Sequence, residues 1–359
     1  MTSALPLPSR SSPAAASASP TAQPEPATRR QWLQRAGGAA ALGLGAGGLL
    51  TSRRSWGAGS AQPLVLSWTG TGLCLSPIIV ANELGYFRNN GVDVDIINFA
   101  GAVDQVLESI ATGKADLSLG LIHAWLKPLE SGFDVKVVGT AHAGCIRVLA
   151  PREKNITSIE AVKGKTIAVS SPAGFGRQFF STALARRGVN PETEVQWRVF
   201  PADQLDLAVN KGEADVIADA DPTLFLVEKR NPGRYVEIAN VQKGDFKDRL
   251  CCIIAARGEL LKNRREEVTA TVRALHQAAL FIADNPGEAA RVVYKHLPRA
   301  SVDELRTILS SFGYRHHTQG IPLESEIEAY ARDLQQVGVL KKSTDPARFA
   351  RHLTVDVLA

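Results

Sequence analysis

Two copies of one pattern decide the fold: residues 103–118 read VDQVLESIATGKADLS, and residues 202–217 read ADQLDLAVNKGEADVI. They align without gaps at a shift of 99 residues and share an Asp-Gln pair, a Gly and an Ala-Asp pair. Each copy predicts a helix of about three turns, a Gly that ends it, and a short apolar strand. A unit repeated at this distance indicates two similar α/β lobes, because solenoids repeat every ~20–50 residues.

Strands and helices alternate on both sides of the two copies. This alternation predicts mostly parallel sheets that are covered by helices on both faces. From about residue 258 to 338 the pattern is helical throughout, and the tail beyond 340 is predicted to be polar and extended. The other predicted strands cover 64–68, 92–98, 135–138, 145–150, 166–170, 195–200, 235–238 and 251–255, and the other predicted helices cover 76–87, 122–130, 159–162, 171–187 and 221–229.

The positive charge of the chain is concentrated near its start. The 359 residues carry 41 Lys and Arg against 36 Asp and Glu, and residues 1–61 hold six of the Arg and one of the acids. The rest of the chain is therefore formally neutral. This balance gives no electrostatic reason to expect nucleic acid or an anionic membrane as a partner.

The first 61 residues resemble an export leader. Residues 1–28 are rich in Ser, Ala and Pro and are predicted to be disordered. Arg29-Arg30 precedes an apolar run at 36–50, as in a twin-arginine signal peptide, and Gly59-Ser60-Ala61 fits a cleavage site. The run is too short and too rich in Gly to span a membrane. We expect a periplasmic protein that is soluble after signal cleavage; a basic, Ala-rich linker is the alternative.

Several short motifs resemble one family of solute-binding proteins. ANELGYF at 81–87 followed by GVDV at 91–94 is similar to the sulfonate/nitrate/taurine-binding group and to the related NMT1/THI5-like group. ATGKAD at 111–116, VKGKTIAV at 162–169 and Asp221-Pro222 fit the same groups, so that the resemblance covers about residues 62–300. It implies an α/β fold of the type II periplasmic binding protein class, with two lobes joined by two crossover segments and a helical C-terminal segment. Lobe I is expected to comprise 62–144 plus 253–359, and lobe II 145–252.

The resemblance implies a receptor rather than an enzyme. Such a protein captures a small molecule (a sulfonate, nitrate, a pyrimidine or a similar organic ligand) between its lobes and delivers it to the membrane permease of an ABC importer. We expect a monomer without a cofactor. The sequence contains no GxSxG, P-loop or HExxH motif that would indicate enzyme chemistry.

Ligand contacts are expected in the loops that follow strands, because ligands bind beyond the carboxyl ends of the strands in open α/β sheets. Ser170, Ser171 and Gly174 precede a helix whose N-terminus can hold an anion or a carbonyl oxygen. Arg177, one turn into this helix, could add a charged fork, although a solvent-facing Arg after a plain helix cap is an equal alternative. Arg147 interrupts an apolar strand and needs a polar partner, which favours the cleft over the core.

The second repeat ends on two acids, Asp219 and Asp221. Two carboxylates in a cleft argue against a small bare anion unless an Arg neutralises them. Trp125 and Phe175 could stack on a flat ligand, and buried aromatic packing is the alternative for both. The predicted ligand-binding residues are Thr71, Cys74, His123, Trp125, Cys145, Arg147, Ser170, Ser171, Gly174, Phe175, Arg177, Asp219 and Asp221.

The four cysteines leave three interpretations open. Cys74 lies in the first post-strand loop, while Cys145 and the pair Cys251-Cys252 begin the two crossover strands, which lie side by side in the family that the chain resembles. His123 and His142 lie on neighbouring loops. The thiols could form a soft-metal or thiol-reactive site, a disulfide from Cys145 to either member of the pair, or ordinary core packing. No CxxC or HxxH spacing is present, so no metal ligand is predicted. A periplasmic enzyme or metal-binding protein that uses this Cys/His cluster is the alternative function.

Overall fold

A computed structural model describes residues 62–359, except 70–71, 100–102, 248, 299 and 317–320. The predicted disordered segment, the twin-arginine pair and the cleavage site lie outside the described residues, as does the candidate Thr71. Within the described ranges, none of the helices combines the length and the apolar character that crossing a bilayer requires.

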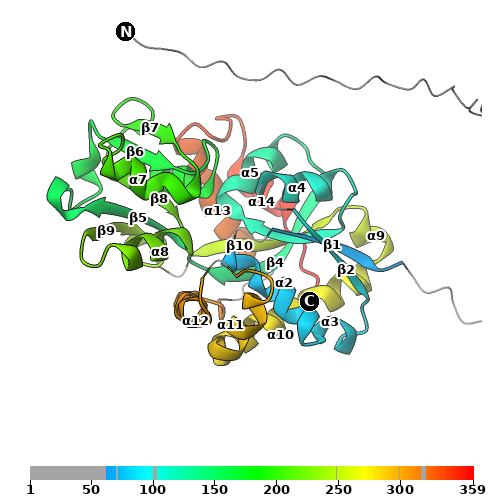
Figure 1. Ribbon diagram of the computed structural model, residues 1–359. Helices are drawn as coiled ribbons and strands as arrows, with labels where there is room; N and C mark the ends of the chain where they lie inside the picture. The colour runs from blue at the N-terminus through cyan, green and yellow to red at the C-terminus, as the bar shows by residue number, and fades with distance from the viewer. Residues whose placement is uncertain (1–61, 70–71, 100–102, 248, 299, 317–320) are drawn as a thin grey trace, which may run out of the picture. The chain divides into compact units, whose positions relative to one another are not determined.

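The first sheet combines four strands from the N-terminal part of the described chain with one strand that follows the whole of the second sheet. Its order is β2-β1-β3-β10-β4 (Figure 1). Strand β1 runs parallel to β2 and β3, whereas β10 runs antiparallel to β3 and β4. The strands are β1 (Leu64–Trp68), β2 (Val94–Asn98), β3 (Leu117–Leu121), β4 (Val135–Ala143) and β10 (Leu250–Arg257).

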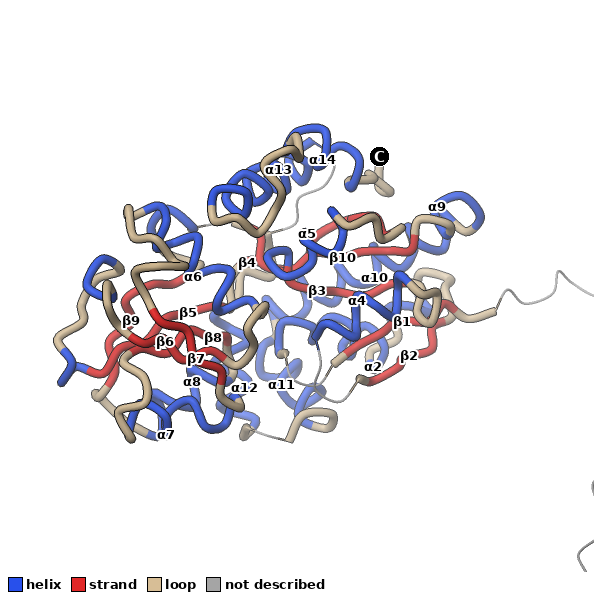
Figure 2. Tube along the Cα trace, turned by 90° about the horizontal axis from the view of Figure 1, so that it is seen from above, coloured by secondary structure: helices blue, strands red, loops and turns tan. Residues whose placement is uncertain are grey.

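The second sheet repeats this plan with the order β7-β6-β8-β5-β9. Strand β6 is parallel to β7 and β8, and β5 is antiparallel to β8 and β9. Figure 2 shows the strands of the two sheets as two separate groups. The predicted pair of α/β lobes is confirmed, with one antiparallel strand inserted in each sheet. The strands are β5 (Ile146–Pro151), β6 (Thr166–Val169), β7 (Gln196–Val199), β8 (Val216–Ala220) and β9 (Tyr235–Asn240).

The Asp of the repeated Ala-Asp corner makes equivalent contacts in both sheets. The Asp116 carboxylate accepts a hydrogen bond from the Val65 N–H at 2.9 Å, and the Asp215 carboxylate accepts one from the Thr166 N–H at 3.0 Å. Each Asp also pairs with a basic side chain at 2.7 or 2.8 Å. A buried or half-buried N–H needs a partner, so that the repeated Asp fixes where each helix–strand unit meets the first strand of its sheet.

Two crossovers connect the sheets and contact each other. The chain leaves the first sheet at Gly144 and Cys145, between β4 and β5, and returns through 241–249, between β9 and β10. Gln242 of the second crossover donates a hydrogen bond to the Gly144 carbonyl oxygen at 3.2 Å. Gly144 has a φ of +72° and leaves no room for a side chain, because a Cβ atom there would lie 2.0 Å from Gln242. The lobe boundaries stay a proposal. Residues Leu250–Cys252 were expected in lobe II, but they belong to β10, which pairs within the first sheet and therefore lies with the first lobe.

Helices cover both faces of the first sheet. Side chains of α2, α10, α11 and α12 share one apolar cluster, and those of α5, α13 and α14 share another on the opposite face. The first sheet's helices are α2 (Ser76–Glu83), α3 (Tyr86–Asn89), α4 (Val103–Ala111) and α5 (Ile122–Glu130); the second sheet's are α6 (Phe175–Arg186), α7 (Leu205–Asn210) and α8 (Thr223–Arg230); and the C-terminal ones are α9 (Leu260–Asn263), α10 (Arg265–Asp284), α11 (Pro286–Tyr294), α12 (Val302–Ser311), α13 (Ile321–Gln336) and α14 (Pro346–Leu353).

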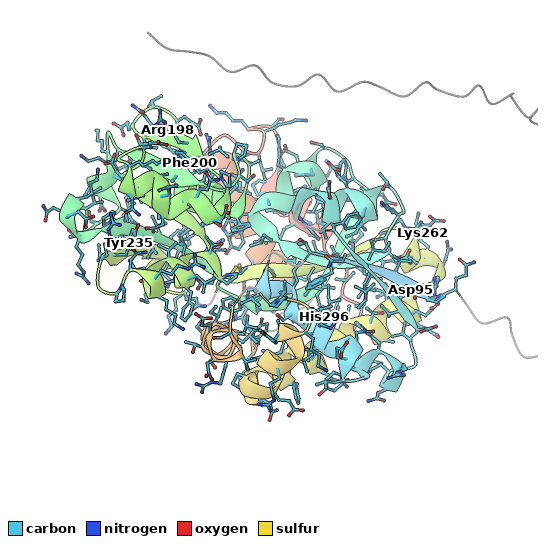
Figure 3. The ribbon with its side chains drawn as sticks, viewed as in Figure 1. Asp95, Arg198, Phe200, Tyr235, Lys262 and His296 are labelled. Carbon is cyan, nitrogen blue, oxygen red and sulfur yellow. The ribbon has the colours of Figure 1, made fainter. Side chains whose placement is uncertain are left out.

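The C-terminal helices also reach the second sheet's elements. Arg186 on α6 makes a two-pronged ion pair with Asp333 on α13, with a shortest distance of 2.7 Å. Arg249, just before β10, donates to the same carboxylate at 2.6 Å. Figure 3 labels Arg198, Phe200 and Tyr235 among the side chains of the second sheet's elements, and Asp95, Lys262 and His296 among those of the first.

The prediction of an extended tail beyond residue 340 is wrong. Residues Pro346–Leu353 form α14, because Asp345 caps the helix by accepting hydrogen bonds from the Ala347 and Arg348 N–H groups, and Pro346 occupies the first helical position. The helix predicted over 76–87 is interrupted at Gly85, between α2 and α3. The strand predicted at 135–138 continues to Ala143 and therefore carries His142.

Candidate functional site

A cavity of about 420 Å³ lies where the post-strand loops of both sheets meet. Its wall follows the ends of β1, β3, β6 and β8, the edge at which ligands bind in open α/β sheets. The lining residues are Thr69, Gly72, Cys74, Leu75, Val106, Leu119, Gly120, Leu121, Ala124, Cys145, Ser170, Ser171, Gly174, Phe175, Ala202, Asp219, Ala220, Asp221 and Thr223.

Eight of the predicted ligand-binding residues lie on this wall. Their contact with a ligand stays a prediction, but the structure brings them to one cavity from four separate parts of the chain. They are Cys74, Cys145, Ser170, Ser171, Gly174, Phe175, Asp219 and Asp221. Sequence reasoning missed the hydroxyl residues Thr69 and Thr223. Thr69 could have been found by the same rule as the others, since it directly follows β1.

Trp125 and His123 do not line the cavity, because both face the core from α5. The Trp125 indole packs behind Gly120, so closely that a Cβ atom on Gly120 would lie 1.9 Å from the ring. The His123 ring contacts Tyr330 and Phe179, with ring centroids 4.6 and 6.2 Å away. Burial lowers the pKa of His123 to about 3, so that its imidazole is neutral at physiological pH.

Arg177 is occupied by its own lobe. Its guanidinium pairs with Glu192 at 3.0 Å and lies over the Trp197 ring, 5.0 Å from the centroid. Neither contact is at the cavity. Arg177 therefore supplies no charged fork to the cavity in this structure, which corresponds to the alternative stated for it above.

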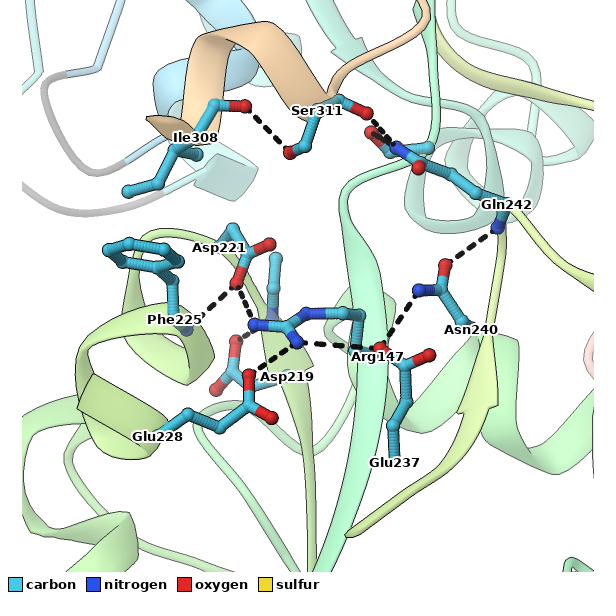
Figure 4. A network of polar contacts seen from close by, with 12 residues as sticks. Arg147, Asp219, Asp221, Phe225, Glu228, Glu237, Asn240, Gln242, Ile308 and Ser311 are labelled. Carbon is cyan, nitrogen blue, oxygen red and sulfur yellow. Dashed lines mark hydrogen bonds and ion pairs between the residues drawn. The ribbon is translucent and has the colours of Figure 1, made fainter. Parts of the chain in front are cut away.

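Arg147 is surrounded by carboxylates (Figure 4). It pairs with Asp221 at 2.8 Å, with Glu228 at 2.5 Å and with Glu237 at 3.4 Å. Asp221 also accepts a hydrogen bond from the Phe225 N–H at 2.9 Å, at the start of α8. The guanidinium does not line this cavity, and both of its terminal NH2 groups are held by these carboxylates, so that it neutralises a cavity acid rather than facing a ligand.

Asp219 is the chemically distinctive residue of the wall. Its Oδ1 accepts a hydrogen bond from the Ala220 N–H at 2.7 Å, whereas its Oδ2 is buried without a hydrogen-bond partner among the described residues. Burial raises the pKa of Asp219 to about 6, although hydrogen bonds from Ser170 and Ala220 oppose this shift. The carboxyl group can thus accept a hydrogen bond when ionised and donate one when protonated.

The charges of the wall favour some ligands over others. It carries two Asp residues and, within the described part of the chain, no Lys, Arg or His. Since Arg147 pairs with Asp221, the carboxyl group that an anionic ligand would meet without a paired cation among the described residues is that of Asp219. The wall suits a neutral or cationic molecule that offers N–H donors to Asp219.

The four cysteine thiols, for which the sequence allows three interpretations, lie together beneath this cavity. The Cys145 and Cys251 sulfur atoms are 3.1 Å apart, and Cys74 and Cys252 join the same buried cluster. His142, which was placed only on a neighbouring loop, lies on β4 beside them.

Comparisons with known proteins identify the family and the fold. A family model described as NMT1/THI5 like matches residues 75–289. A 4-amino-5-hydroxymethyl-2-methylpyrimidine phosphate synthase of Saccharomyces cerevisiae is 23% identical over 252 residues, which are 67% of this chain and 72% of the yeast protein.

Solved structures show the same fold. The alkanesulfonate-binding protein of Xanthomonas axonopodis bound to MOPS superposes with a TM-score of 0.66 at 17% identity, covering 81% of this chain and 99% of that one. The periplasmic nitrate-binding protein of Synechocystis superposes with a TM-score of 0.67 at 13% identity, covering 82% and 86%. The predicted type II periplasmic binding protein fold is confirmed. Since the family model spans more than half of the sequence, the chain belongs to the NMT1/THI5-like family.

Proposed function

We propose that this protein is the exported receptor of an ABC importer and that it captures a neutral or cationic heterocycle bearing N–H groups, such as a pyrimidine. The observation that carries the proposal is Asp219 on the cavity wall: Asp221 is paired with Arg147, whereas the described lining contains no Lys, Arg or His that could pair with Asp219. Sulfonate and nitrate, which structurally similar proteins bind, are anions and favour cationic or N–H-rich walls. A wall that presents an uncompensated carboxyl group disfavours them.

The size and chemistry of the cavity fit such a ligand. About 420 Å³ falls within the usual ~300–1,000 Å³ of small-molecule sites. Asp219, whose Oδ2 has no hydrogen-bond partner among the described residues, can accept a hydrogen bond from a ring or exocyclic N–H, and Phe175 lines the same cavity with an aromatic ring. The pyrimidine in the names of the yeast relatives supports this ligand class.

Ligand capture then works by closure of two lobes around the cavity. The hinge comprises the two crossovers, about residues 143–147 and the segment between β9 and β10. A ligand that contacts both lobes favours the closed state by its differential affinity. The export leader, the periplasmic location, the monomeric state and delivery to a membrane permease belong to the same proposal, and so does the absence of catalysis.

A thermal-shift panel on the mature chain tests the ligand class. Pyrimidines and other nitrogen heterocycles should raise Tm, and sulfonates and nitrate should not; ligand at about a thousand times Kd stabilises by ~4 kcal/mol. Asp219→Asn should abolish the shift, whereas Asp203→Asn, which removes an exposed charge outside this cavity, should preserve it. A shift with sulfonate or nitrate and none with heterocycles would contradict the proposal.

A further inference from the structure

Five buried side chains with metal-binding atoms converge at the floor of the cavity. The donor atoms of Cys74, His142 and Cys145 all lie within 4.8 Å of one another, and so do those of His142, Cys251 and Cys252. None of the five residues is more than 5% exposed. All four cysteines of the 359-residue chain are in this cluster, although they come from three distant segments.

The fold builds the cluster at the crossover between the lobes. Cys74 sits in a single helical turn, Leu73–Leu75, directly before α2. Cys145 follows the Gly144 turn in the first crossover, and Cys251 is the second residue of β10, the strand that follows the second crossover. Because the crossovers are adjacent, residues more than a hundred positions apart bring their sulfur atoms to 3.1 Å.

A β-bulge explains how two consecutive cysteines reach the same cluster. Adjacent side chains in a regular strand point to opposite faces. Here Leu250 is opposite Ala143 and Cys252 is opposite His142, so that Cys251 is an extra residue in β10. Such a bulge re-aims side chains: Cys251 and Cys252 both join one apolar cluster, while Leu250 and Ile253 join the one on the other face.

His142 completes the donor set. Its ring stacks on Phe312, with centroids 5.3 Å apart and planes at 14°, which fixes the imidazole orientation. The ring is fully buried, and no protein nitrogen or oxygen among the described residues hydrogen-bonds either ring nitrogen. Leaving these atoms without a partner is costly. The sulfur atoms of the four cysteines each lie close to a ring nitrogen, within 4.8 Å of it.

We propose that the floor of the cavity is a binding site for a closed-shell thiophilic metal ion, Zn(II) or Cu(I), formed by Cys74, Cys145, Cys251, Cys252 and His142. Thiolate and imidazole donors are the set that these ions prefer. Each thiol that becomes a ligand releases its proton to solvent, and no oxidation is involved. Cys74 and Cys145 line the cavity, which provides the path of entry.

The two other interpretations explain less of the cluster. Packing alone accounts for small buried residues, but not for four thiols gathered around an imidazole whose nitrogens find no hydrogen-bond partner in the described ranges. A disulfide between Cys145 and Cys251 would use two thiols and leave His142 as it is. A metal ion gives partners to the thiols and to the imidazole together.

Metal retention by the full chain tests the site without reference to any cavity ligand. The protein is purified reduced and without oxygen, stripped with a chelator, and loaded separately with Zn(II), Cu(I) or, as a spectroscopic probe, Co(II). Elemental analysis after gel filtration should give about one ion per chain. Co(II) should produce thiolate charge-transfer absorption, and bound metal should protect the thiols from alkylation.

Variants assign the ligands. Cys145→Ser, Cys251→Ser and His142→Asn should each weaken retention at least ~10-fold. His123→Asn removes an imidazole that is buried to a similar extent, has no hydrogen-bond partner among the described residues and belongs to neither group of metal-binding atoms. This variant should retain metal as the wild type does. The wild-type spectrum and alkylation protection remain decisive if a variant does not fold.

Three results would overturn the site. They are a reduced wild-type chain that retains no metal, retention that is equal in the wild type and the Cys→Ser variants, and a Cys145–Cys251 disulfide that forms as fast in the presence of metal as in its absence.

Discussion

Arg147 donates a hydrogen bond to Asp221 at 2.8 Å, so that the guanidinium on the first crossover strand neutralises an acid of the cavity wall. The same guanidinium contacts Glu228 and Glu237. One cation thus holds together three carboxylates from β8–α8 and β9 on the strand that links the lobes. Within the part of the chain that the structure describes, the second wall acid, Asp219, has no ion pair with a basic side chain, and the ligand preference proposed here follows from that difference.

Replacing Arg147 by Met should destabilise the fold by roughly 2–4 kcal/mol, because three carboxylates would lose their shared partner. The side chains of Arg147 and Asp221 are 14% and 8% exposed, which limits solvent screening of this pair. Urea unfolding measures the loss. Arg187→Met is the matched control: that side chain is 45% exposed and its pairs with Glu160 and Asp245 should contribute less than about 1 kcal/mol. Equal losses in the two variants would contradict the account.

Asp219 should make the fold less stable as pH rises. Its pKa is about 6 when folded against an ordinary 3.8, so between those values the folded chain holds a proton that the unfolded chain has released. The free energy of unfolding therefore falls as pH increases from about 4 to 6. At pH 7 the penalty is roughly 3 kcal/mol at most.

Asp219→Asn should remove this slope and stabilise the protein at pH 7 while impairing ligand binding. Burial also raises the pKa of Asp221, which contributes the same sign, so the wild-type curve minus the variant curve is the quantity to compare. Urea unfolding at a series of pH values provides it. A difference curve that stays flat from pH 4 to 7 would show that Asp219 is not strained by burial.

Gly120→Ala should destabilise the cavity wall, because the new methyl group would clash with the Trp125 ring packed against Gly120. A Cβ atom there would lie 1.9 Å from the Trp125 ring, which is fully buried and cannot move aside. Overpacking of this kind costs about 1–3 kcal/mol or more. Gly139→Ala, in a strand of the same sheet, meets its nearest neighbours at 3.5 Å and should be tolerated. Thermal unfolding of both variants checks the contrast, and a Gly120→Ala protein as stable as Gly139→Ala would refute the packing described.

Most of the fold could be predicted because its signals are local. Gly113 and Gly212 both adopt positive φ at the ends of the repeated helices, and the following Asp residues make equivalent backbone contacts. Strand and helix order followed from apolar periodicity. The last helix was missed because the Asp345-Pro346 start signal stood in a polar segment whose apolar face is short.

The residues of the candidate site could be predicted only where their position after a strand determines their location. Post-strand loops identified eight wall residues, since strand ends converge in this architecture. The directions of His123 and Trp125 depend on how α5 packs against its neighbours, and the partners of Arg147 and Arg177 lie far along the chain. The gathering of thiols followed from the crossovers, but the bulge that turns Cys251 and Cys252 to one face has no signature in the sequence.

Binding and recovery of a pyrimidine by the purified mature chain tests the central proposal most directly. Equilibrium dialysis with a labelled pyrimidine, followed by mass spectrometry of the released ligand, measures affinity and chemical fate in one experiment. A receptor should bind the pyrimidine saturably, exclude sulfonate and nitrate as competitors, and release the ligand chemically unchanged. Conversion of the ligand to a product, or displacement by sulfonate or nitrate, would contradict the account.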